Sequence, residues 1–435
     1  MNFSQQFDMT TDSGLFPPVP TWQRDGFEPD EYGLWRSPSG AAALPVFEGR
    51  MINQFDPSEK RWVSGKGRRA VWAEVDWRNK IPGPQYLMSA SDYAASDKRI
   101  GVAAFYYMKI SSATNSRTMI GTVLPDTPSV YSLCELVQQA FSIDDWLVMS
   151  AILNSFAFDF VVRLRLGGLN ITGYVLDETP VPQVGSAARQ GLARHAAGLS
   201  FSSVTFAPFW RQAAVAGFWA MPDVPWRQLW AASSTDRLRR RCILDAVASG
   251  LFGLEAAGLR WILRDSDRPC DELRNEAVAR QLDPKGFWRV DKDRDPELRH
   301  TVLTLVAFAD LEAKIVGCGG DREKGIEAFL NQNDGEGWML PETLRLADYG
   351  LGHDERSKVP QPVASRLGPR FYDWQLAQTA EESWRECESH ARNLSRDTPI
   401  APSSDGSDQA FADNTHGVGK TVVDIASGNP RRLFD

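Results

Sequence analysis

The residues best suited to do chemistry in this chain are cations, and they are concentrated in one stretch. Residues 50–124 contain twelve Lys and Arg but six Asp and Glu, a local balance of +6 in a chain whose formal net charge is −8. To bind a polyanion such as DNA, a protein needs positive charge only on the face that docks. A basic region inside an acidic chain can therefore bind a polyanion. Chance clustering of charge on a solvated surface is the alternative.

Three shorter patterns suggest a site, and each has a plainer interpretation. Residues 414–421, Asn-Thr-His-Gly-Val-Gly-Lys-Thr, end like a phosphate-binding loop but have Asn414 where glycine is needed and no buried strand before them. Glu312-Ala-Lys314 matches the Glu-x-Lys of metal-dependent nucleases, yet it closes an apolar helix instead of lying on a strand. His353-Asp354-Glu355 is a candidate metal cluster but fits a polar loop better. We expect no cofactor and no metal to be bound by this chain.

The basic run Arg-Leu-Arg-Arg-Arg at 237–241 leaves two interpretations open. Its guanidinium groups are suited to gripping phosphates. The run equally fits the solvated face of a helix whose opposite face is formed by Ile243, Leu244 and Val247.

The composition is that of an ordinary globular protein of two or three domains. The chain has 435 residues, of which 43% are hydrophobic and 24% charged. It has no apolar run of about eighteen residues and no N-terminal secretory signal, so we expect no membrane partner. Its five scattered cysteines include no Cys-x-x-Cys pair, which argues against a zinc ribbon or a disulfide framework. A cytoplasmic location fits best.

The pattern of helices and strands expected from the sequence predicts a mixed α+β fold with four regions. Residues 1–42 read as an irregular lead-in, 43–183 as a mainly β recognition domain with one long helix, 184–395 as a helical region, and 396–435 as a disordered tail. The predicted strands are 69–77, 100–110 (buried on both faces), 117–125 and 169–182. The long helix begins at a capping box on Ser142 and ends at Gly167-Gly168. Later helices are predicted within 234–263 (two), from Asp295-Pro296 over 296–315, and over 379–395.

Two elements needed for adenine methylation are missing from the sequence. A DNA adenine methyltransferase holds S-adenosylmethionine with a Gly-rich loop and polarises the exocyclic amine with an Asn/Asp-Pro-Pro-aromatic turn. The one Pro-Pro pair, Pro17-Pro18, follows Phe16. The chain therefore contains no catalytic motif of that kind.

Other parts of the chain nevertheless match such enzymes, in order. Leu-Pro-Val-Phe-Glu-Gly-Arg-Met begins at Leu44, Thr-Asn-Ser-Arg-Thr at Thr114 and Asn-Ser-Phe at Asn154. Further matching segments are 169–182, 241–263, 285–311 and 337–352. Together, over roughly 44–395, they resemble the target-recognition and C-terminal region of large adenine-N6 DNA methyltransferases. This family includes fused type II restriction–modification enzymes and related phage-defence methylases.

The resemblance implies a DNA sequence-recognition part of a site-specific methyltransferase, without its catalytic domain. It implies double-stranded DNA and a methyltransferase catalytic subunit or domain as partners, with S-adenosylmethionine bound on that catalytic part, and a helicase or nuclease of a defence system as a further partner. The chain would then be a split subunit, a truncated product or a decayed copy. A rival interpretation makes the helical half a non-catalytic scaffold in a defence complex.

The resemblance and the local charge together select the candidate DNA contacts. Lys66, Arg68 and Arg69 lie on the glycine-rich Ser-Gly-Lys-Gly-Arg-Arg loop, which we expect at phosphates or in a groove. Asn154, Ser155 and Asn170 are expected to fix a helix–strand junction instead. The full candidate set is Arg50, Lys66, Arg68, Arg69, Lys98, Arg99, Asn115 and Arg117.

Overall fold

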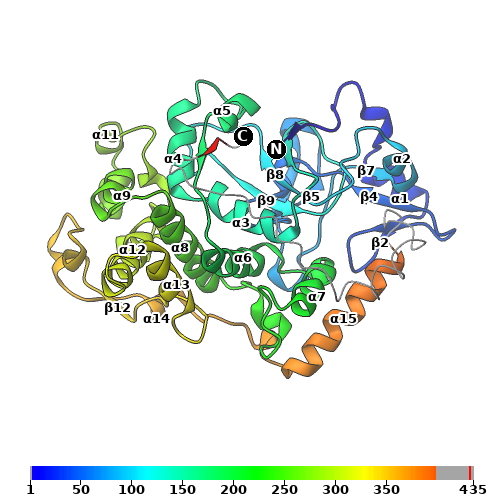
Figure 1. Ribbon diagram of the computed structural model, residues 1–435. Coiled ribbons are helices and arrows are strands. Elements are labelled where there is room, and N and C mark those ends of the chain that lie inside the picture. The colour runs from blue at the N-terminus through cyan, green and yellow to red at the C-terminus, as the bar shows by residue number, and fades with distance from the viewer. Residues whose placement is uncertain (1, 398–430, 433–435) are drawn as a thin grey trace.

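The computed structural model describes residues 2–397 and the pair Arg431–Arg432. It confirms a mixed α+β fold, with β-sheets in residues 1–137 and a helical region over 143–395 (Figure 1). The predicted disordered tail, 396–435, and the Gly-Lys-Thr segment at 414–421 lie outside the described residues, apart from the end of helix α15 (Ala380–Asp397) and strand β14 (Arg431–Arg432).

The main sheet has four antiparallel strands in the order β1-β10-β8-β9. Its strands are β1 (Asn2–Ser4), β8 (Ala104–Met108), β9 (Gly121–Leu124) and β10 (Leu133–Val137). Strand β8 is buried on both faces, as predicted. Phe105 and Tyr107 pack into the largest hydrophobic core, whereas Ala104 and Tyr106 pack into a second one on the opposite face.

The first 42 residues, predicted to be irregular, contain regular structure. They supply β1, helix α1 (Val19–Arg24), β2 (Glu28–Pro29), β3 (Trp35–Arg36) and the start of β4 (Ala42–Pro45). A second sheet has the order β2-β3-β4-β7, with β7 at Leu87–Ser89 followed by α2 (Ala90–Ala95). A separate hairpin pairs β5 (Lys60–Ser64) with β6 (Val71–Glu74).

The long helix predicted from Ser142 is two helices. The capping box on Ser142 is present, but α3 (Ile143–Leu153) ends at Asn154, and α4 (Phe156–Arg165) leaves at a bend of 66°. The Asn154 amide exchanges hydrogen bonds with the Gly121 backbone of β9, at 3.1 and 2.9 Å, and the Ser155 hydroxyl caps α4. Asn154 therefore ties α3 to strand β9, whereas Ser155 lies at the junction of two helices, so the predicted helix–strand role holds for Asn154 and not for Ser155.

The strand predicted over 169–182 is wrong. Residues Gly173–Asp177 form the short helix α5, and the extended part is limited to β11 (Pro180–Val181), which pairs with β14 (Arg431–Arg432). Asn170 is exposed and makes a backbone bridge to Ile110 next to β8.

The helical region is centred on α8 (Ser234–Leu251), which packs against α3, α4, α6, α12 and α13. The two helices predicted within 234–263 are confirmed as α8 and α9, and α15 confirms the helix predicted over 379–395. The helix predicted from Asp295 is partly wrong, because residues Pro296–Leu298 form a 3-10 turn and α12 begins at His300. The helices of this region, besides α8, have the following bounds: α6 (Ser186–Ser200), α7 (Ala207–Ala216), α9 (Ala256–Ile262), α10 (Cys270–Arg274), α11 (Glu276–Ala279), α12 (His300–Gly317), α13 (Arg322–Asn331), α14 (Ala364–Leu367) and α15 (Ala380–Asp397).

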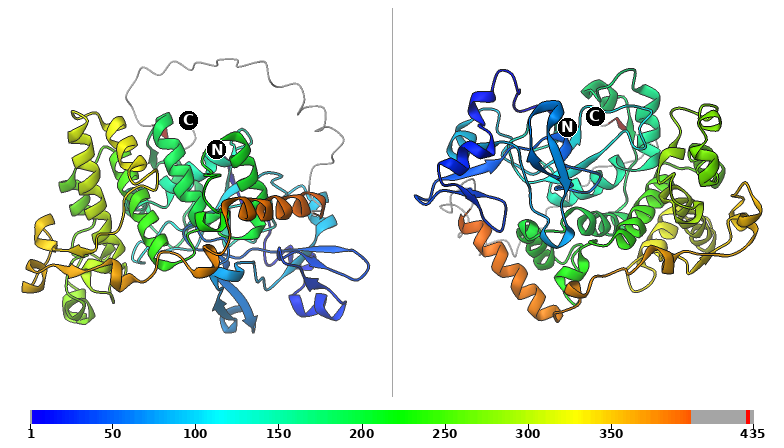
Figure 2. Two further views of the ribbon diagram at one scale, coloured as in Figure 1. Left: turned by 90° about the horizontal axis from the view of Figure 1, so that it is seen from below. Right: turned by 180° about the vertical axis from the view of Figure 1, so that it is seen from behind.

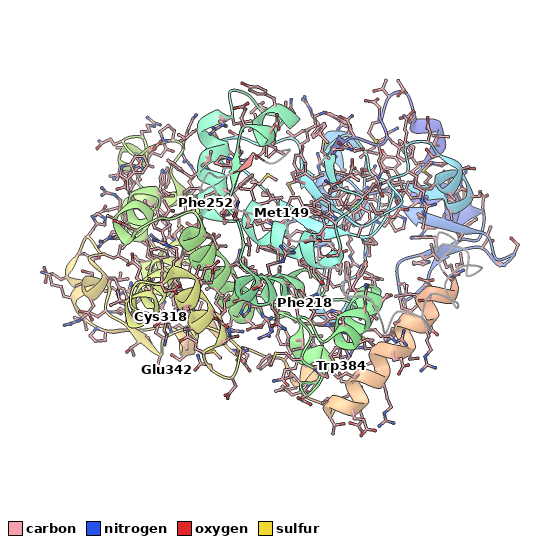
Figure 3. All side chains as sticks on the ribbon, viewed as in Figure 1. Met149, Phe218, Phe252, Cys318, Glu342 and Trp384 are labelled. Atoms are coloured by element: carbon pink, nitrogen blue, oxygen red, sulfur yellow. The ribbon has the colours of Figure 1, made fainter. Side chains whose placement is uncertain are left out.

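One hydrophobic core joins the sheet to the helices. It includes Phe105 of β8, Leu153 of α3 and Leu244 of α8, and it reaches Ala391 of α15. Side chains fill the space between these ribbons, among them Met149 on α3 and Trp384 on α15 (Figure 3). Helix α15 returns to the N-terminal half, where His390 contacts the Tyr32 hydroxyl at 3.0 Å (Figure 2). Two short strands of the helical region, β12 (Thr343–Leu344) and β13 (Gln361–Pro362), pair antiparallel.

No single helix in the described part of the chain is long and apolar enough to cross a bilayer. Two bent helix pairs, α3 with α4 and α8 with α9, meet the criterion of length and composition when each pair is taken together. Most of their side chains are buried in the core of the protein.

The arginine run at 237–241 does not form the solvated helix face that was one of its two predicted roles. Arg237, Arg239 and Arg240 are buried on α8, where Asp236 accepts hydrogen bonds from Arg239 at 2.9 Å and from Arg240 at 2.7 Å. Arg370, beyond α14, also reaches Asp236 at 3.0 Å. Burial alone would raise the pKa of Asp236, but these three guanidinium groups hold it well below its usual range.

We expect Asp236→Asn to lower the free energy of unfolding by about 3–5 kcal/mol, because it leaves buried guanidinium groups without their counter-charge. Urea unfolding of the wild-type and variant chains measures the difference. Glu276→Gln, which removes the exposed partner of Arg280, is the control and should cost less than about 1 kcal/mol. Equal losses in the two variants would contradict a structural role for the buried charge.

A second prediction concerns Glu135 on β10, which is fully buried and accepts a hydrogen bond from Ser129. Burial raises the pKa of Glu135 from 4.5 to about 8. Between these values the folded chain keeps a proton that the unfolded chain releases, so this group lowers stability as pH rises from about 5 to 8.

We therefore expect Glu135→Gln to stabilise the protein relative to wild type by an amount that grows with pH. Since one pKa unit corresponds to about 1.4 kcal/mol, the gain at pH 8 should be of the order of a few kcal/mol. Unfolding midpoints of both chains at several pH values measure it. The exposed Glu74→Gln serves as control, and a pH-independent difference for Glu135→Gln would refute the assignment.

Candidate nucleic-acid interface

The hairpin of β5 and β6 is the most exposed part of the basic region. It projects from the body of the protein in the view from below (Figure 2). Trp62 lies opposite Trp72, and Lys60 lies opposite Glu74, with a register shift between Trp62 and Ser64. Both tryptophans are half-buried against the body, so the strands are held at the base while the connecting loop is surrounded by solvent.

The tip of this hairpin carries Lys66, Arg68 and Arg69, and all three side chains are exposed. Among the described residues, none forms an ion pair with them. Gly65 has φ +80°, and its carbonyl accepts hydrogen bonds from Trp62 Nε1 at 3.0 Å and from Gln85 Nε2 at 3.2 Å. The loop is therefore held by its backbone, which leaves the three cations available to a ligand.

The base of the hairpin is anchored by charge. Lys80 pairs with Asp56 at 2.8 Å in the interior, and its ammonium group lies 3.8 Å from the centre of the Trp77 ring. Arg237 of α8 lies 4.1 Å from the same ring and donates to the Phe55 carbonyl at 3.3 Å. Burial lowers the pKa of Arg237 to about 10, against the opposing charge of Asp56. This cation–π arrangement connects the hairpin to the helical region.

Arg50 is the exposed residue of a 3-10 turn, Gly49–Met51, whose other two residues are buried and which contacts β5. A Cβ atom on Gly49 would lie 2.9 Å from the Ser132 carbonyl oxygen, so glycine permits a close backbone approach there. Burial raises the pKa of the neighbouring Glu48 to about 7, although the charge of Arg50 opposes this. Arg50 is therefore accessible beside the hairpin base.

Lys98 and Arg99 are occupied by ion pairs within the protein. Lys98 contacts Asp12 at 2.6 Å, and Arg99 contacts Asp126 at 2.6 Å. Asp126 also accepts hydrogen bonds from the Tyr93 hydroxyl and the Gly101 backbone. These pairs fasten the segment after α2 to its neighbours, so a DNA contact would compete with them.

Asn115 and Arg117 are close in sequence but differ in accessibility. Asn115 is exposed, and its backbone carbonyl accepts a hydrogen bond from Arg163 at 2.9 Å. Arg117 is 8% exposed, pairs with Asp159 at 3.1 Å and lies 4.0 Å from the centre of the Phe156 ring. Arg117 therefore belongs to a core ion pair and is not part of the proposed interface.

The structure adds three cations to the hairpin that the sequence did not single out. Lys60, Arg61 and Arg78 are exposed on or beside its strands. The sequence of β5, Lys-Arg-Trp-Val-Ser, does not alternate at period two, and Arg78 follows β6, so no strand pattern singled these cations out. Together with Lys66, Arg68 and Arg69, they make the hairpin the densest accessible group of cations in the basic region.

A cleft of about 830 Å³ lies between the N-terminal strands and the helical region. Apolar side chains dominate its walls, among them Phe47, Leu124 and Phe209. Its cations Arg36, Lys80 and Arg99 are each paired with an aspartate. The cleft is therefore poorly suited to a phosphate backbone.

The other predicted sites have structural roles. The Glu312 carboxylate accepts a hydrogen bond from the Ala256 backbone at 2.8 Å and so caps α9. His353 contacts Asp267 at 3.2 Å. In the described part of the chain, no three or more His, Cys, Asp or Glu side chains are grouped to hold a metal ion.

No protein-family model matches this chain, and no curated protein matches it significantly. The functional interpretation therefore depends on the sequence resemblance and on the geometry of the hairpin.

We expect Gly65→Ala to disrupt the hairpin tip, because the added Cβ would lie 2.3 Å from the Arg69 carbonyl oxygen at a backbone angle that favours glycine. Trypsin should then cleave the loop after Lys66, Arg68 or Arg69 faster than in the wild-type protein. Gly67→Ala is a matched control, since Gly67 also has positive φ but has open space around it. Equal cleavage rates in the two variants would show that the close contact does not hold the loop.

Proposed function

We propose that this chain is the DNA sequence-recognition part of a site-specific adenine-N6 DNA methyltransferase of a restriction–modification or phage-defence system. The observation that carries the proposal is the β5–β6 hairpin, with three exposed and unpaired cations at its tip among the described residues. The ordered resemblance along the sequence supplies the class of enzyme.

The dimensions of the hairpin suit the major groove of DNA. The groove is about 12 Å wide and about 8.5 Å deep and admits a two-stranded ribbon. Beyond the half-buried Trp62, β5 extends by two residues, roughly 7 Å at about 3.3 Å per residue, before the tip residues 65–70. The tip can therefore reach base edges while the cations along the strands lie near the phosphates.

The proposal assigns different roles to the candidate residues. Lys66, Arg68 and Arg69 contact phosphates or the groove, and Arg50 contacts a phosphate beside the hairpin base. Asn115 is an exposed polar group available to a longer interface. Lys98 and Arg99 act through the internal ion pairs that hold their segment.

Methylation in this proposal requires a methyltransferase catalytic subunit or domain. Chemistry on an adenine requires the base to be flipped out of the duplex. The catalytic subunit would hold S-adenosylmethionine and the flipped base, while this chain grips and reads the flanking duplex.

We expect Arg68→Ala/Arg69→Ala to weaken binding to duplexes of all sequences. Each lost phosphate contact should reduce the slope of log affinity against log salt by about 0.9, so the double variant should lose up to about two units. Fluorescence anisotropy over a range of salt concentrations measures both quantities.

The matched control is Arg274→Ala/Arg280→Ala, which removes two exposed cations from the helical region. It should leave affinity and slope unchanged. If the hairpin variant binds like wild type, the tip is not the interface. If the wild-type chain binds no duplex at low salt, the recognition function itself is wrong.

A further inference from the structure

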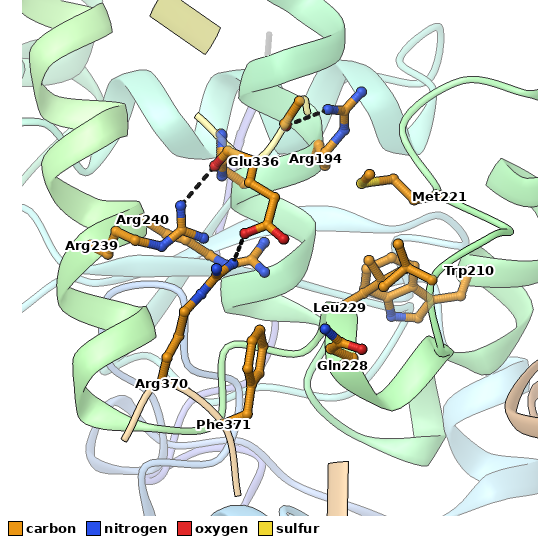
Figure 4. A pocket seen from close by; sticks show the side chains of 13 residues that line it. Arg194, Trp210, Met221, Gln228, Leu229, Arg239, Arg240, Glu336, Arg370 and Phe371 are labelled. Carbon is orange, nitrogen blue, oxygen red and sulfur yellow. Dashed lines mark hydrogen bonds and ion pairs between the residues drawn. The ribbon is translucent and has the colours of Figure 1, made fainter. Parts of the chain in front are cut away.

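A small cavity in the helical region is lined by four arginines. Arg194 comes from α6, Arg239 and Arg240 from α8, and Arg370 from the segment after α14 (Figure 4). The cavity has a volume of about 30 Å³, and Trp210, Met221, Leu229 and Phe371 form its apolar walls. No residue of the hairpin lines it, and it plays no part in the proposed DNA contact.

The charges around this cavity do not balance. Its four guanidinium groups face two carboxylates, Asp236 and Glu336, so the cluster carries a net charge of +2. Asp236 binds Arg239, Arg240 and Arg370, and Glu336 pairs with Arg370. Arg194 has no carboxylate partner among the described residues, and its Nη1 donates to the Gly335 carbonyl at 2.7 Å. Burial, and then the charge of Arg240, lower the pKa of Arg194.

Polar atoms at the cavity are also left without partners. His195, next to Arg194 on α6, is 1% exposed, and both of its ring nitrogens are buried with no hydrogen-bond partner. The Nε atom of Arg194 is buried and unpartnered as well. A buried polar group without a partner costs about 1–3 kcal/mol, so such groups in a native protein usually meet a ligand or ordered water.

We propose that this cavity binds a phosphate group. A phosphate dianion matches the net charge of +2, and its tetrahedral oxygens accept hydrogen bonds from several guanidinium and imidazole donors at once. Arg194 and His195 supply the unpartnered donors, and Arg240 adds a second guanidinium. A volume of about 30 Å³ admits a small group and excludes a larger ligand from the interior.

Thermal unfolding of the full chain in sodium phosphate and in sodium chloride at equal ionic strength tests the proposal. A ligand that binds the folded state alone raises the midpoint progressively once its concentration exceeds the dissociation constant. We expect phosphate to raise the wild-type midpoint beyond chloride and Arg194→Gln to abolish that difference.

Arg189→Gln is the matched control, because Arg189 lies on the same helix but pairs with Asp145 outside the cavity. It should respond to phosphate as wild type does. A wild-type midpoint that rises no more in phosphate than in chloride overturns the proposal. So does an Arg194→Gln variant that responds like wild type.

Calorimetric titration of the wild-type chain keeps the proposal testable if Arg194→Gln does not fold. Saturable binding of inorganic phosphate with one site per chain is expected, and its absence overturns the proposal. Competition by a nucleoside 5′-monophosphate distinguishes the source of the group. Displacement of inorganic phosphate identifies a phosphomonoester ligand, whereas no displacement identifies the free ion.

Discussion

Helix α8 carries Asp236, Arg237, Arg239, Arg240 and Asp245 into the centre of the molecule, where each charge must be matched. Their partners come from distant parts of the chain. Arg370 reaches Asp236, the Phe55 carbonyl accepts from Arg237, and His300 contacts Asp245 at 2.9 Å. Because an unmatched buried charge is strongly destabilising, these pairs fix the position of the surrounding segments relative to α8.

This constraint explains how an exposed hairpin can be placed reliably. Trp77 lies between the hairpin and the helical region and contacts both Lys80 and Arg237. A paired strand ribbon alone is marginally stable in water. Its attachment to a charged and fully packed helix gives the tip a defined position, while the tip itself is free of internal ion pairs among the described residues. Buried arginines of α8 thus organise the fold, whereas Arg68 and Arg69 at the tip remain available to a polyanion.

Local patterns predicted much of the fold. The unbroken apolar run in β8, the capping box on Ser142 and the helices α8, α9 and α15 all follow from periodicity and caps. The break at Asn154 could not be predicted in this way, because it depends on hydrogen bonds to β9, a strand distant in sequence.

Arg117 and the 237–241 run were placed on the surface for a similar reason. Arginine is seldom buried unless it is paired, and the pairing carboxylates, Asp159 and Asp236, become visible once the chain is folded. Within the candidate site, the glycine-rich tip was found from composition, whereas Lys60, Arg61 and Arg78 needed the hairpin geometry.

The central claim is that the β5–β6 hairpin is the part of this chain that touches duplex DNA. Ultraviolet cross-linking of the full chain to a pool of randomised duplexes, followed by mass spectrometry of the cross-linked peptides, tests it most directly. The account predicts nucleotide adducts on peptides from residues 60–80, which contain the tip cations and three tryptophans. Stable complexes whose adducts map entirely to other segments would contradict it.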